Sequence, residues 1–253
     1  MTVPNGSQTP KMSGTIVDHV EERDGEPLFS TLFDDHYFSR HDGLAESRYV
    51  FVDGNHLPSR LAALPAEATF RIGELGFGTG LNFLATWALW RDLRPGDAVL
   101  HFTSVEGFPI TAEQAAKAHG QWLELEVLST ELIAQWQHLC DGVWLDPQTH
   151  LRVVVDEALH AMGQFEPLQN AWYLDGFSPA KNPDMWSLPL MQALADKSAP
   201  DATLASYTAA GWVRRNLRNA GFDVAKQKGF GTKRDMIVGH LNRVEFASLD
   251  GPR

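Results

Sequence analysis

Cysteine is almost absent from this chain, and so are long hydrophobic runs. Cys140 is the single cysteine among 253 residues, which excludes a disulfide framework and a cluster of thiolate metal ligands. No apolar run reaches the roughly 18 residues that a membrane-spanning helix requires. Residues 1–9 are polar and lack a hydrophobic signal core, and the histidines have no metal-ligand spacing. We therefore expect a cytoplasmic protein without a metal or a membrane partner.

Positive charge is also scarce, except in one segment. The net charge is -11, which argues against a nucleic-acid partner. Within residues 211–234, however, seven basic residues outnumber one acidic residue, which leaves this segment at +6 and the remainder at -17. A local basic surface can hold phosphates even on an acidic protein. A solvated helix and strand face is the alternative that the charges alone leave open.

Three glycines at alternate positions mark a turn between a predicted strand and a predicted helix. Residues 69–75 are typical of a buried strand, Gly76, Gly78 and Gly80 follow, and apolar residues recur at helical spacing from Leu81. Glycine is required where the backbone takes a positive φ or lies close to a ligand. A dinucleotide-binding turn would have glycine or alanine at position 81, and the Gly-Lys-Ser/Thr ending of a phosphate loop is absent. A nicotinamide dehydrogenase is therefore disfavoured.

The pattern Glu-x-Gly-x-Gly-x-Gly resembles the first motif of the Rossmann-like methyltransferases. The resemblance implies an α/β fold, the Rossmann-like class I methyltransferase fold, with a mostly parallel seven-stranded sheet and an antiparallel last strand. It also implies S-adenosyl-L-methionine as the cofactor, with the glycine turn passing under its methionine part. The turn residues expected to bind it are Glu74, Gly76, Gly78, Thr79, Gly80 and Asn82. An ordinary glycine-rich turn without a ligand is the alternative.

Acidic residues follow three further predicted strands. In open α/β sheets ligands bind beyond the carboxyl ends of the strands. Glu106, after the strand at 99–105, is expected to accept both hydroxyls of the adenosine ribose, and Asp156, after 151–155, the adenine amino group. Asp175, after 171–174, is expected near the methyl donor. A solvent-facing loop glutamate and a helix N-cap aspartate are the plain alternatives for Glu106 and Asp175.

The remaining chain predicts four regions. They are a disordered leader at 1–12, an N-terminal extension covering the cleft at 13–66, the Rossmann-like domain at 67–243 and a tail at 244–253. A hairpin turn is expected at Asp24-Gly25, and a capping box at Thr111 opens a helical region that runs to about His138 with a break near Leu128-Ser129. Further helices are expected at 58–64, 81–90, 189–197 and 209–220, a strand at 203–207, and a closing strand pair at 222–228 and 236–240.

Two longer runs resemble one particular family. They are Asp-Gly-Phe-Ser-Pro-Ala-Lys-Asn-Pro-Asp-Met-Trp at 175–186 and Lys-Gly-Phe-Gly-Thr-Lys-Arg at 228–234. With the glycine turn they resemble the methyltransferase half of the MnmC family, which also occurs alone as MnmD, over residues 14–241. The resemblance implies methyl transfer to the amine of 5-aminomethyl-(2-thio)uridine at the tRNA wobble position. No second glycine motif for FAD follows, so we expect no oxidase activity and a separate enzyme that supplies the aminomethyl substrate.

The resemblance also assigns roles to residues. Asp175 is expected to orient the substrate amine and to accept its proton. Residues expected to contact tRNA are Phe177, Pro179, Lys181, Trp186, Arg214, Arg215, Lys228, Phe230, Lys233 and Arg234. Phe177, Pro179 and Trp186 offer flat apolar surface for a base, whereas a plain surface role for Lys181 is equally open. A methyltransferase of a small amine and a non-catalytic RNA-binding relative remain alternatives.

Overall fold

The computed structural model describes residues 19–22, 26–39, 42–93, 96–166 and 168–242. The predicted leader at 1–12 and tail at 244–253 lie outside these ranges, as do the residues of the predicted hairpin turn at 24–25. Within the described ranges, no helix has both the length and the apolar character needed to cross a membrane.

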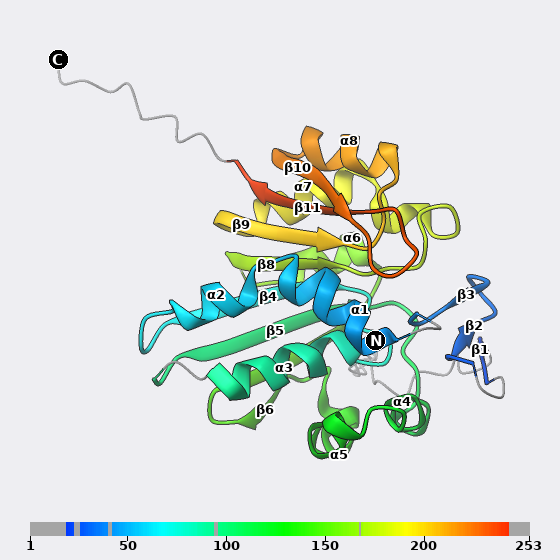
Figure 1. The fold of residues 1–253 in the computed structure, drawn as a ribbon, viewed down its shortest axis with the longest axis vertical. Helices are drawn as coiled ribbons and strands as arrows, with labels where there is room; N and C mark the ends of the chain where they lie inside the picture. Colours follow the sequence, from blue (N-terminus) through cyan, green and yellow to red (C-terminus); the bar gives the residue numbers. More distant parts are fainter. Residues whose placement is uncertain (1–18, 23–25, 40–41, 94–95, 167, 243–253) are drawn as a thin grey trace, which may run out of the picture.

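Eight strands form the central sheet (Figure 1). In order across the sheet they are β10 (Phe222–Lys228), β11 (Asp235–Leu241), β9 (Ser198–Ser206), β8 (Gln169–Leu174), β4 (Thr69–Leu75), β5 (Val99–Glu106), β7 (Thr149–Val155) and β6 (Val143–Asp146). The five strands from β9 to β7 are parallel. β11 lies antiparallel between β9 and β10, and β6 is antiparallel to β7. The mostly parallel sheet and the antiparallel last strand are therefore confirmed.

The predicted number of seven strands is wrong by one, because β6 was not expected. β6 has four residues at the edge of the sheet, and its pairing with β7 is irregular between Trp144 and Asp146. Val143 and Leu145 contact the core, whereas the Trp144 side chain on the other face is 55% exposed. So short an edge strand has no continuous apolar run that would distinguish it from a loop.

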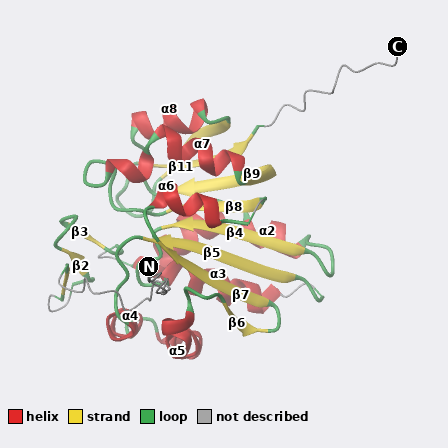
Figure 2. Ribbon diagram, turned by 180° about the vertical axis from the view of Figure 1, so that it is seen from behind, coloured by secondary structure: helices red, strands yellow, loops and turns green. Residues whose placement is uncertain are grey.

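Helices cover both faces of the sheet (Figures 1 and 2). One layer contains α1 (Gly43–Ser47), α2 (Leu57–Ala62) and α3 (Leu81–Leu93), with a π-helical turn at Arg48–Asp53 between α1 and α2. The other layer contains α6 (Ala158–Ala161), α7 (Leu188–Asp196) and α8 (Gly211–Asn219). The chain between β5 and β6 forms α4 (Ala112–His119) and α5 (Glu126–Gln135). The sheet is thus the middle of three layers, with one apolar core on each side.

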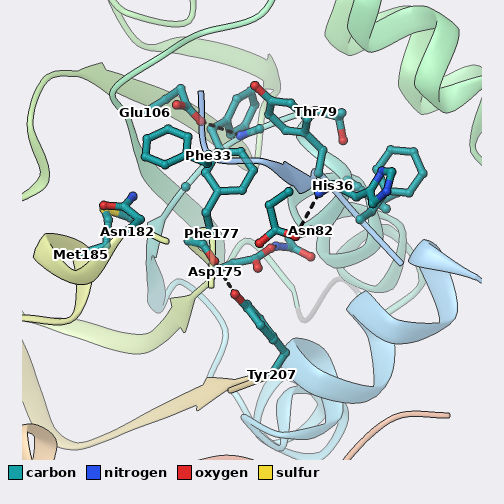
Figure 3. Close-up of a pocket in the computed structure, with 18 of the residues that line it drawn as sticks. Phe33, His36, Thr79, Asn82, Glu106, Asp175, Phe177, Asn182, Met185 and Tyr207 are labelled. Atoms are coloured by element: carbon teal, nitrogen blue, oxygen red, sulfur yellow. Dashed lines mark hydrogen bonds between the residues drawn. The ribbon is translucent and has the colours of Figure 1, made fainter. Parts of the chain in front are cut away.

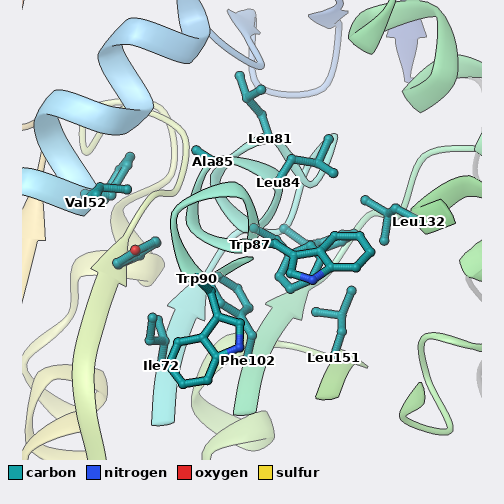
Figure 4. Packing of buried hydrophobic residues seen from close by; sticks show 14 of the residues in the cluster. Val52, Ile72, Leu81, Leu84, Ala85, Trp87, Trp90, Phe102, Leu132 and Leu151 are labelled. Carbon is teal, nitrogen blue, oxygen red and sulfur yellow. The ribbon is translucent and has the colours of Figure 1, made fainter. Parts of the chain in front are cut away.

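α3 forms the centre of the first core (Figure 4). Phe83, Leu84, Trp87 and Trp90 are fully buried, because the helix packs against α1 and α2 on one side and α5 on another. A helix that is apolar almost all round is typical of such a sandwiched position. The burial fixes the direction of α3 and therefore the place of its first turn, which adjoins the glycine turn.

The expected helices are found within three residues of their predicted ends at each boundary, but the break between α4 and α5 lies elsewhere. The capping box at Thr111 is confirmed, since its hydroxyl accepts the Gln114 N–H at 3.1 Å and the Gln114 side chain accepts the Thr111 N–H at 2.9 Å. The break predicted near Leu128-Ser129 is wrong, because both residues lie within α5 and are 8% exposed. α4 instead ends at Gly120, and a 3₁₀ turn at Leu123–Leu125 precedes α5.

A small antiparallel sheet lies beyond the carboxyl ends of the parallel strands (Figure 1). Its strands are β1 (Val20–Glu21), β2 (Phe29–Ser30) and β3 (Asp35–His36). The chain that follows, from α1 to α2, contributes Leu44 and Leu57 to the same core as Ile72 of β4. The division of the chain between residues 66 and 67 stays a prediction.

Candidate functional site

A cavity of about 650 Å³ opens at the carboxyl ends of β4, β5, β8 and β9 (Figure 3). Its wall comes from the glycine turn, the loops after β5, β7 and β8, residues within 33–39 and 43–47, and the turn between β10 and β11. The position is the one at which open α/β sheets bind ligands, and the volume is within the range of about 300–1,000 Å³ that is usual for small-molecule sites.

Gly76 brings the glycine turn into close contact with the end of β8. Its φ is +91°, and a Cβ atom at this position would lie 1.9 Å from the carbonyl oxygen of Asp175. The Asp175 N–H in turn donates to the Leu75 carbonyl at 3.0 Å. Only glycine fits both the backbone angle and the space, so the sequence of the turn sets the position of Asp175.

Asn82, in the first turn of α3, connects two carboxyl groups. Its side-chain N–H groups donate to Asp175 Oδ2 at 2.6 Å and to Glu74 Oε1 at 3.0 Å. The Ser47 hydroxyl donates to Asn82 Oδ1 at 2.6 Å, and the Ser104 hydroxyl donates to Glu74 Oε2 at 2.7 Å. These bonds orient the amide so that its two hydrogens face the carboxyl groups, and they hold Asp175 in one position.

The two carboxyl groups differ in their access to the cavity. Asp175 lines the cavity, whereas Glu74 is fully buried beneath it. The expectation that Glu74 contacts a ligand is therefore not supported, because its carboxyl group is already enclosed by Asn82 and Ser104. Glu74 acts on the site by fixing Asn82. Thr79 and Asn82 both reach the cavity wall.

Burial and neighbouring charges shift the pKa values of Asp175 and Glu74. Burial raises the pKa of Asp175 to about 7, and the nearby negative charge of Glu46 adds to the effect, while the Asn82 hydrogen bond and the Lys233 ammonium group oppose it. Burial likewise raises the pKa of Glu74 well above its usual value. A carboxyl group with a pKa near 7 exchanges protons readily at neutral pH.

Glu106 connects the glycine turn to the loop after β5. Its two oxygens accept the N–H groups of Gly78 and Phe108, each at 2.8 Å. Burial raises the pKa of Glu106, and these N–H groups oppose the shift. The side chain lines the cavity, as predicted for a residue at this strand end. Ribose binding by Glu106 stays a prediction.

Asp156 and Glu157 lie on the cavity wall where α6 begins. Asp156 Oδ2 is hydrogen-bonded to His160 Nδ1 at 2.6 Å, and its Oδ1 accepts the Glu157 N–H at 2.8 Å. Glu157 caps α6 by accepting the N–H groups of Leu159 and His160. Asp156 thus lies where the adenine prediction requires it, while Glu157 has a structural role.

The loop after β8 is attached to the N-terminal segment. Phe177 lines the cavity and stacks on Phe33, with ring centroids 4.6 Å apart and an interplanar angle of 22°. The Lys181 ammonium group donates to the Asp34 carbonyl and lies 3.3 Å from an Asp34 carboxylate oxygen. Phe177 therefore lies at the cavity, where it was expected to contact a base. Lys181 connects the loop after β8 to the N-terminal segment through Asp34.

Two residues of this loop do not face the cavity, in contrast to the prediction. Pro179 is buried, and the Trp186 side chain is 1% exposed in the second core, with its indole N–H donating to the Phe177 carbonyl at 3.1 Å. Neither surface is available to stack on a base. Asn182 and Met185 line the cavity instead.

The basic segment contributes one charged residue, Lys233, to the cavity lining, together with Thr232. Lys233, in the turn between β10 and β11, lines the cavity and donates to Glu46 Oε1 at 2.7 Å. The other predicted substrate residues lie outside the cavity lining, on α8, at the end of β10 and on the same turn: Arg214, Arg215, Lys228, Phe230 and Arg234. The Arg234 side chain is 95% exposed. The turn follows the carboxyl end of β10, so these charges lie along the edge of the sheet that carries the cavity.

Several cavity residues were not predicted. They are Phe33, Tyr37, Glu46, Phe108 and Tyr207. Tyr207 directly follows β9, so the same strand-end rule could have identified it. Glu46 carries no comparable signal, because it lies in a short helix 187 positions away from Lys233.

The residues present fit S-adenosyl-L-methionine. Gly78 leaves free the space in which a Cβ atom would lie 3.2 Å from the Tyr37 ring, at the cavity wall. Acidic groups for hydroxyl and amino donors follow β5 and β7, at Glu106 and Asp156. Among the described residues, no group of three or more His, Cys, Asp or Glu side chains is placed to hold a metal ion.

Comparisons with known proteins agree with this geometry. Residues 123–242 match the family model described as S-adenosyl-L-methionine-dependent methyltransferase. The tRNA 5-methylaminomethyl-2-thiouridine biosynthesis bifunctional protein MnmC of Chromobacterium violaceum is 44% identical over 91% of this chain and 35% of its own length. The protein of the same name from Marinobacter nauticus is 45% identical over 89% of this chain and 37% of its own length. This chain thus spans about a third of these relatives.

A solved structure shares the fold. The crystal structure of MNMC2 from Aquifex aeolicus has a TM-score of 0.69 at 21% identity, and the match covers 94% of this chain and 72% of that chain. S-adenosyl-L-methionine is the cofactor of the matching family. The chain is therefore similar, over about nine tenths of its own length, to one part of the MnmC proteins, and it has the fold of the S-adenosyl-L-methionine-dependent methyltransferases.

Proposed function

We propose that this chain transfers the methyl group of S-adenosyl-L-methionine to the primary amine of 5-aminomethyl-(2-thio)uridine at the wobble position of tRNA. The product is 5-methylaminomethyl-(2-thio)uridine, and the reaction takes place in the cytoplasm, where a separate enzyme supplies the aminomethyl group. The MnmC relatives are named as tRNA 5-methylaminomethyl-2-thiouridine biosynthesis proteins, which supports a tRNA nucleoside as the substrate. The observation that carries the proposal is Asp175, a cavity carboxyl group beside the glycine turn with a pKa near neutrality.

The chemistry requires a base at the position of Asp175. An alkyl amine is mostly protonated at neutral pH, and the protonated form has no lone pair for a new bond. Asp175 accepts that proton, directly or through a water molecule. Its pKa of about 7 is closer to the pKa of the amine than the pKa of an exposed aspartate is, which makes the proton transfer easier. The hydrogen bond from Asn82 keeps the accepting oxygen in place.

The glycine turn and the acidic residues at the ends of β5 and β7 hold the methyl donor in this proposal. Bound S-adenosyl-L-methionine supplies a methyl group on a positively charged sulfur, which leaves as a neutral thioether. Glu106 and Asp156 accept hydrogen bonds from its ribose and adenine. The stacked rings of Phe33 and Phe177 give the cavity an apolar wall, and an apolar surrounding favours a reaction that disperses charge.

The edge of the sheet beside the cavity supports a polyanionic substrate. Arg215, Lys228 and Arg234 are exposed there, and Tyr49, which is 38% exposed, lies next to Phe230 with ring centroids 5.9 Å apart. Exposed basic groups bind phosphates without sequence preference, and aromatic rings offer a stacking surface for unpaired bases. tRNA combines both features in its anticodon loop.

Methyl transfer to bulk tRNA tests the proposal. Labelled S-adenosyl-L-methionine is incubated with tRNA from cells that lack this protein, using the wild type, Asp175→Asn and the exposed control Asp92→Asn on α3. We expect label in 5-methylaminomethyl uridine with the wild type and the control, and its loss with Asp175→Asn. Donor binding without label in any tRNA would contradict the tRNA proposal, and label in small amines instead would support the small-amine alternative.

A further inference from the structure

One ammonium group already lies inside the cavity, and it belongs to the protein. Lys233 Nζ is 2.7 Å from Glu46 Oε1 and 4.5 Å from the centroid of the Tyr207 ring. Both partners line the cavity, as Lys233 does. A carboxylate binds an ammonium group through a charge-assisted hydrogen bond, and the face of an aromatic ring binds it through a cation–π interaction. Together they form a site with the shape and charge for an ammonium group.

The three members of this cluster differ in how firmly they are held. The Glu46 side chain is 11% exposed and comes from α1, which Asp42 caps. The Tyr207 hydroxyl donates to the Gly176 carbonyl at 2.7 Å, in the loop that begins at Asp175. Lys233 is 44% exposed and lies on a turn whose neighbour Gly231 has no atom within 4 Å of an added Cβ. The anionic and aromatic partners are fixed, whereas the cation is attached to the open part of the cavity wall.

We propose that Glu46 and the Tyr207 ring form an ammonium-binding subsite beside Asp175, which Lys233 occupies in the free protein and the protonated amine of the substrate occupies on binding. The identity of that amine rests on the proposed function; the subsite itself rests on the Glu46, Tyr207 and Lys233 geometry. Lys233 is then an exchangeable occupant that keeps Glu46 paired until the substrate arrives.

The exchange is consistent with the charges of the site. Without Lys233, the cavity would contain the carboxyl groups of Glu46 and Asp175 close enough for Glu46 to raise the pKa of Asp175. An unpaired carboxylate with so little exposure is costly, so one cation must accompany Glu46 in both states. When the substrate ammonium group takes this place, Lys233 is released toward the basic residues of the sheet edge, where phosphates bind. A neutral analogue cannot make this replacement.

Binding of two nucleosides that differ only in charge tests the subsite. The probes are 5-aminomethyluridine and 5-hydroxymethyluridine, and their affinities are measured by calorimetry with S-adenosylhomocysteine present. We expect the wild type to prefer the amine about tenfold, as a charge-assisted hydrogen bond provides. Glu46→Gln should reduce this preference to about twofold or less, without weakening the binding of the hydroxymethyl probe.

Lys233→Met gives the opposite result if Lys233 is a competing occupant. The amine should bind about threefold more tightly than to the wild type, because it no longer displaces an internal cation. The control is Glu124→Gln, which removes a carboxylate from an exposed ion pair with Arg48, whose side chains are 58% and 43% exposed; it should keep the wild-type preference. An unchanged preference in Glu46→Gln, weaker amine binding in Lys233→Met, or no preference in the wild type would each overturn the inference.

Failure of this inference and failure of the proposed function have different signatures. If the wild type labels tRNA but Glu46→Gln still prefers the amine, the subsite is wrong and the function stands. If the wild type labels no tRNA but prefers the amine through Glu46, the subsite is right and the proposed substrate is wrong.

Discussion

The two sides of the cavity are built in different ways. The strand side, formed by Glu74–Asn82, Glu106 and Asp175, consists of residues directly at the carboxyl ends of neighbouring strands and in the turn that follows β4. The closing side is formed by residues within 33–39 and 43–47 and by residues 232–233, and it joins segments 187 positions apart through the pair of Glu46 and Lys233. The parallel strands place the first side, whereas the second side depends on contacts between α1 and the hairpin of β10 and β11, which are distant in the sequence. We therefore expect the strand side to govern folding and the chemical step, and the closing side to govern the choice of substrate.

The largest expected effect is on Asp175, where the two sides meet. Asp175→Asn should reduce kcat for methyl transfer about 10²- to 10⁴-fold, because the proton acceptor is lost. Binding of S-adenosyl-L-methionine should change by less than about threefold, since the amide still accepts the hydrogen bond from Asn82. Single-turnover kinetics and calorimetry measure the two quantities. A normal kcat in this variant would show that Asp175 does not take part in the chemical step, and would contradict the assignment of that step to the strand side.

A pair of glycine substitutions compares the rigidity of the two sides. Gly76→Ala places a Cβ atom 1.9 Å from the Asp175 carbonyl oxygen at a φ of +91°, so we expect a loss of about 3 kcal/mol or more in the free energy of unfolding. Gly231→Ala has a φ of +56° and no atom within 4 Å, so we expect a loss of about 1 kcal/mol. Denaturant titration measures both. Equal losses would show that the closing side is as constrained as the strand side.

The raised pKa of Asp175 also predicts how the stability of the protein depends on pH. The pKa is about 7 in the folded protein and 3.8 for an ordinary aspartate, so the folded state binds the proton more tightly than the unfolded state does. Stability should therefore fall as the pH rises from about 4 to about 7, and the loss should persist above pH 7. Because Asp175→Asn carries no charge there, it should be more stable than the wild type by about 1–3 kcal/mol at pH 8 and equally stable at pH 4. A stability difference that does not change with pH would count against a raised pKa at Asp175.

The smallest effects are expected from the charges outside the cavity. Arg215→Ala and Lys228→Ala should each reduce the slope of log affinity for tRNA against log salt concentration by about 1, and weaken binding less than tenfold at moderate salt. The matched control is Arg91→Ala. Arg91 lies in the last turn of α3 and is paired with Glu131, and its loss should leave the slope unchanged. Filter binding at several salt concentrations measures the slopes. An equal reduction in the control would place the phosphate contacts elsewhere.

The sequence predicted the strand side well, because its signals are local. The short run at 69–75, which was predicted as a buried strand, is β4 with its observed bounds. Acidic residues at the ends of strands reach the cavity because parallel strands end at one edge. Burial, in contrast, cannot be inferred from residue type, and for this reason Trp186 was expected to face a substrate but lies in the core. The four residues of β6 were too few to show a period.

The closing side was predicted only as a region, an N-terminal extension expected to cover the cleft, and its individual contacts were not predicted for another physical reason. The place of Glu46 depends on the packing of α1 against α3 and on the hairpin of β10 and β11, and no pattern within ten residues of Glu46 encodes either contact. Lys233 was predicted to contact tRNA, from the basic segment and from the Lys-Gly-Phe-Gly-Thr-Lys-Arg run at 228–234. Its ion pair with Glu46 could be identified only from the three-dimensional structure.

The insertion of β11 between β9 and β10 sets an order of events on the ribosome. β10 emerges before β11, yet among the described strands β11 is its only neighbour in the sheet. β10 must therefore remain unpaired until β11 has been synthesised and has joined β9, and only then does the connecting turn bring Lys233 to Glu46. A nascent chain that ends before β11 can complete the strand side but not the closing side. Such a chain would acquire a place for the methyl donor before it acquires the means to choose an acceptor.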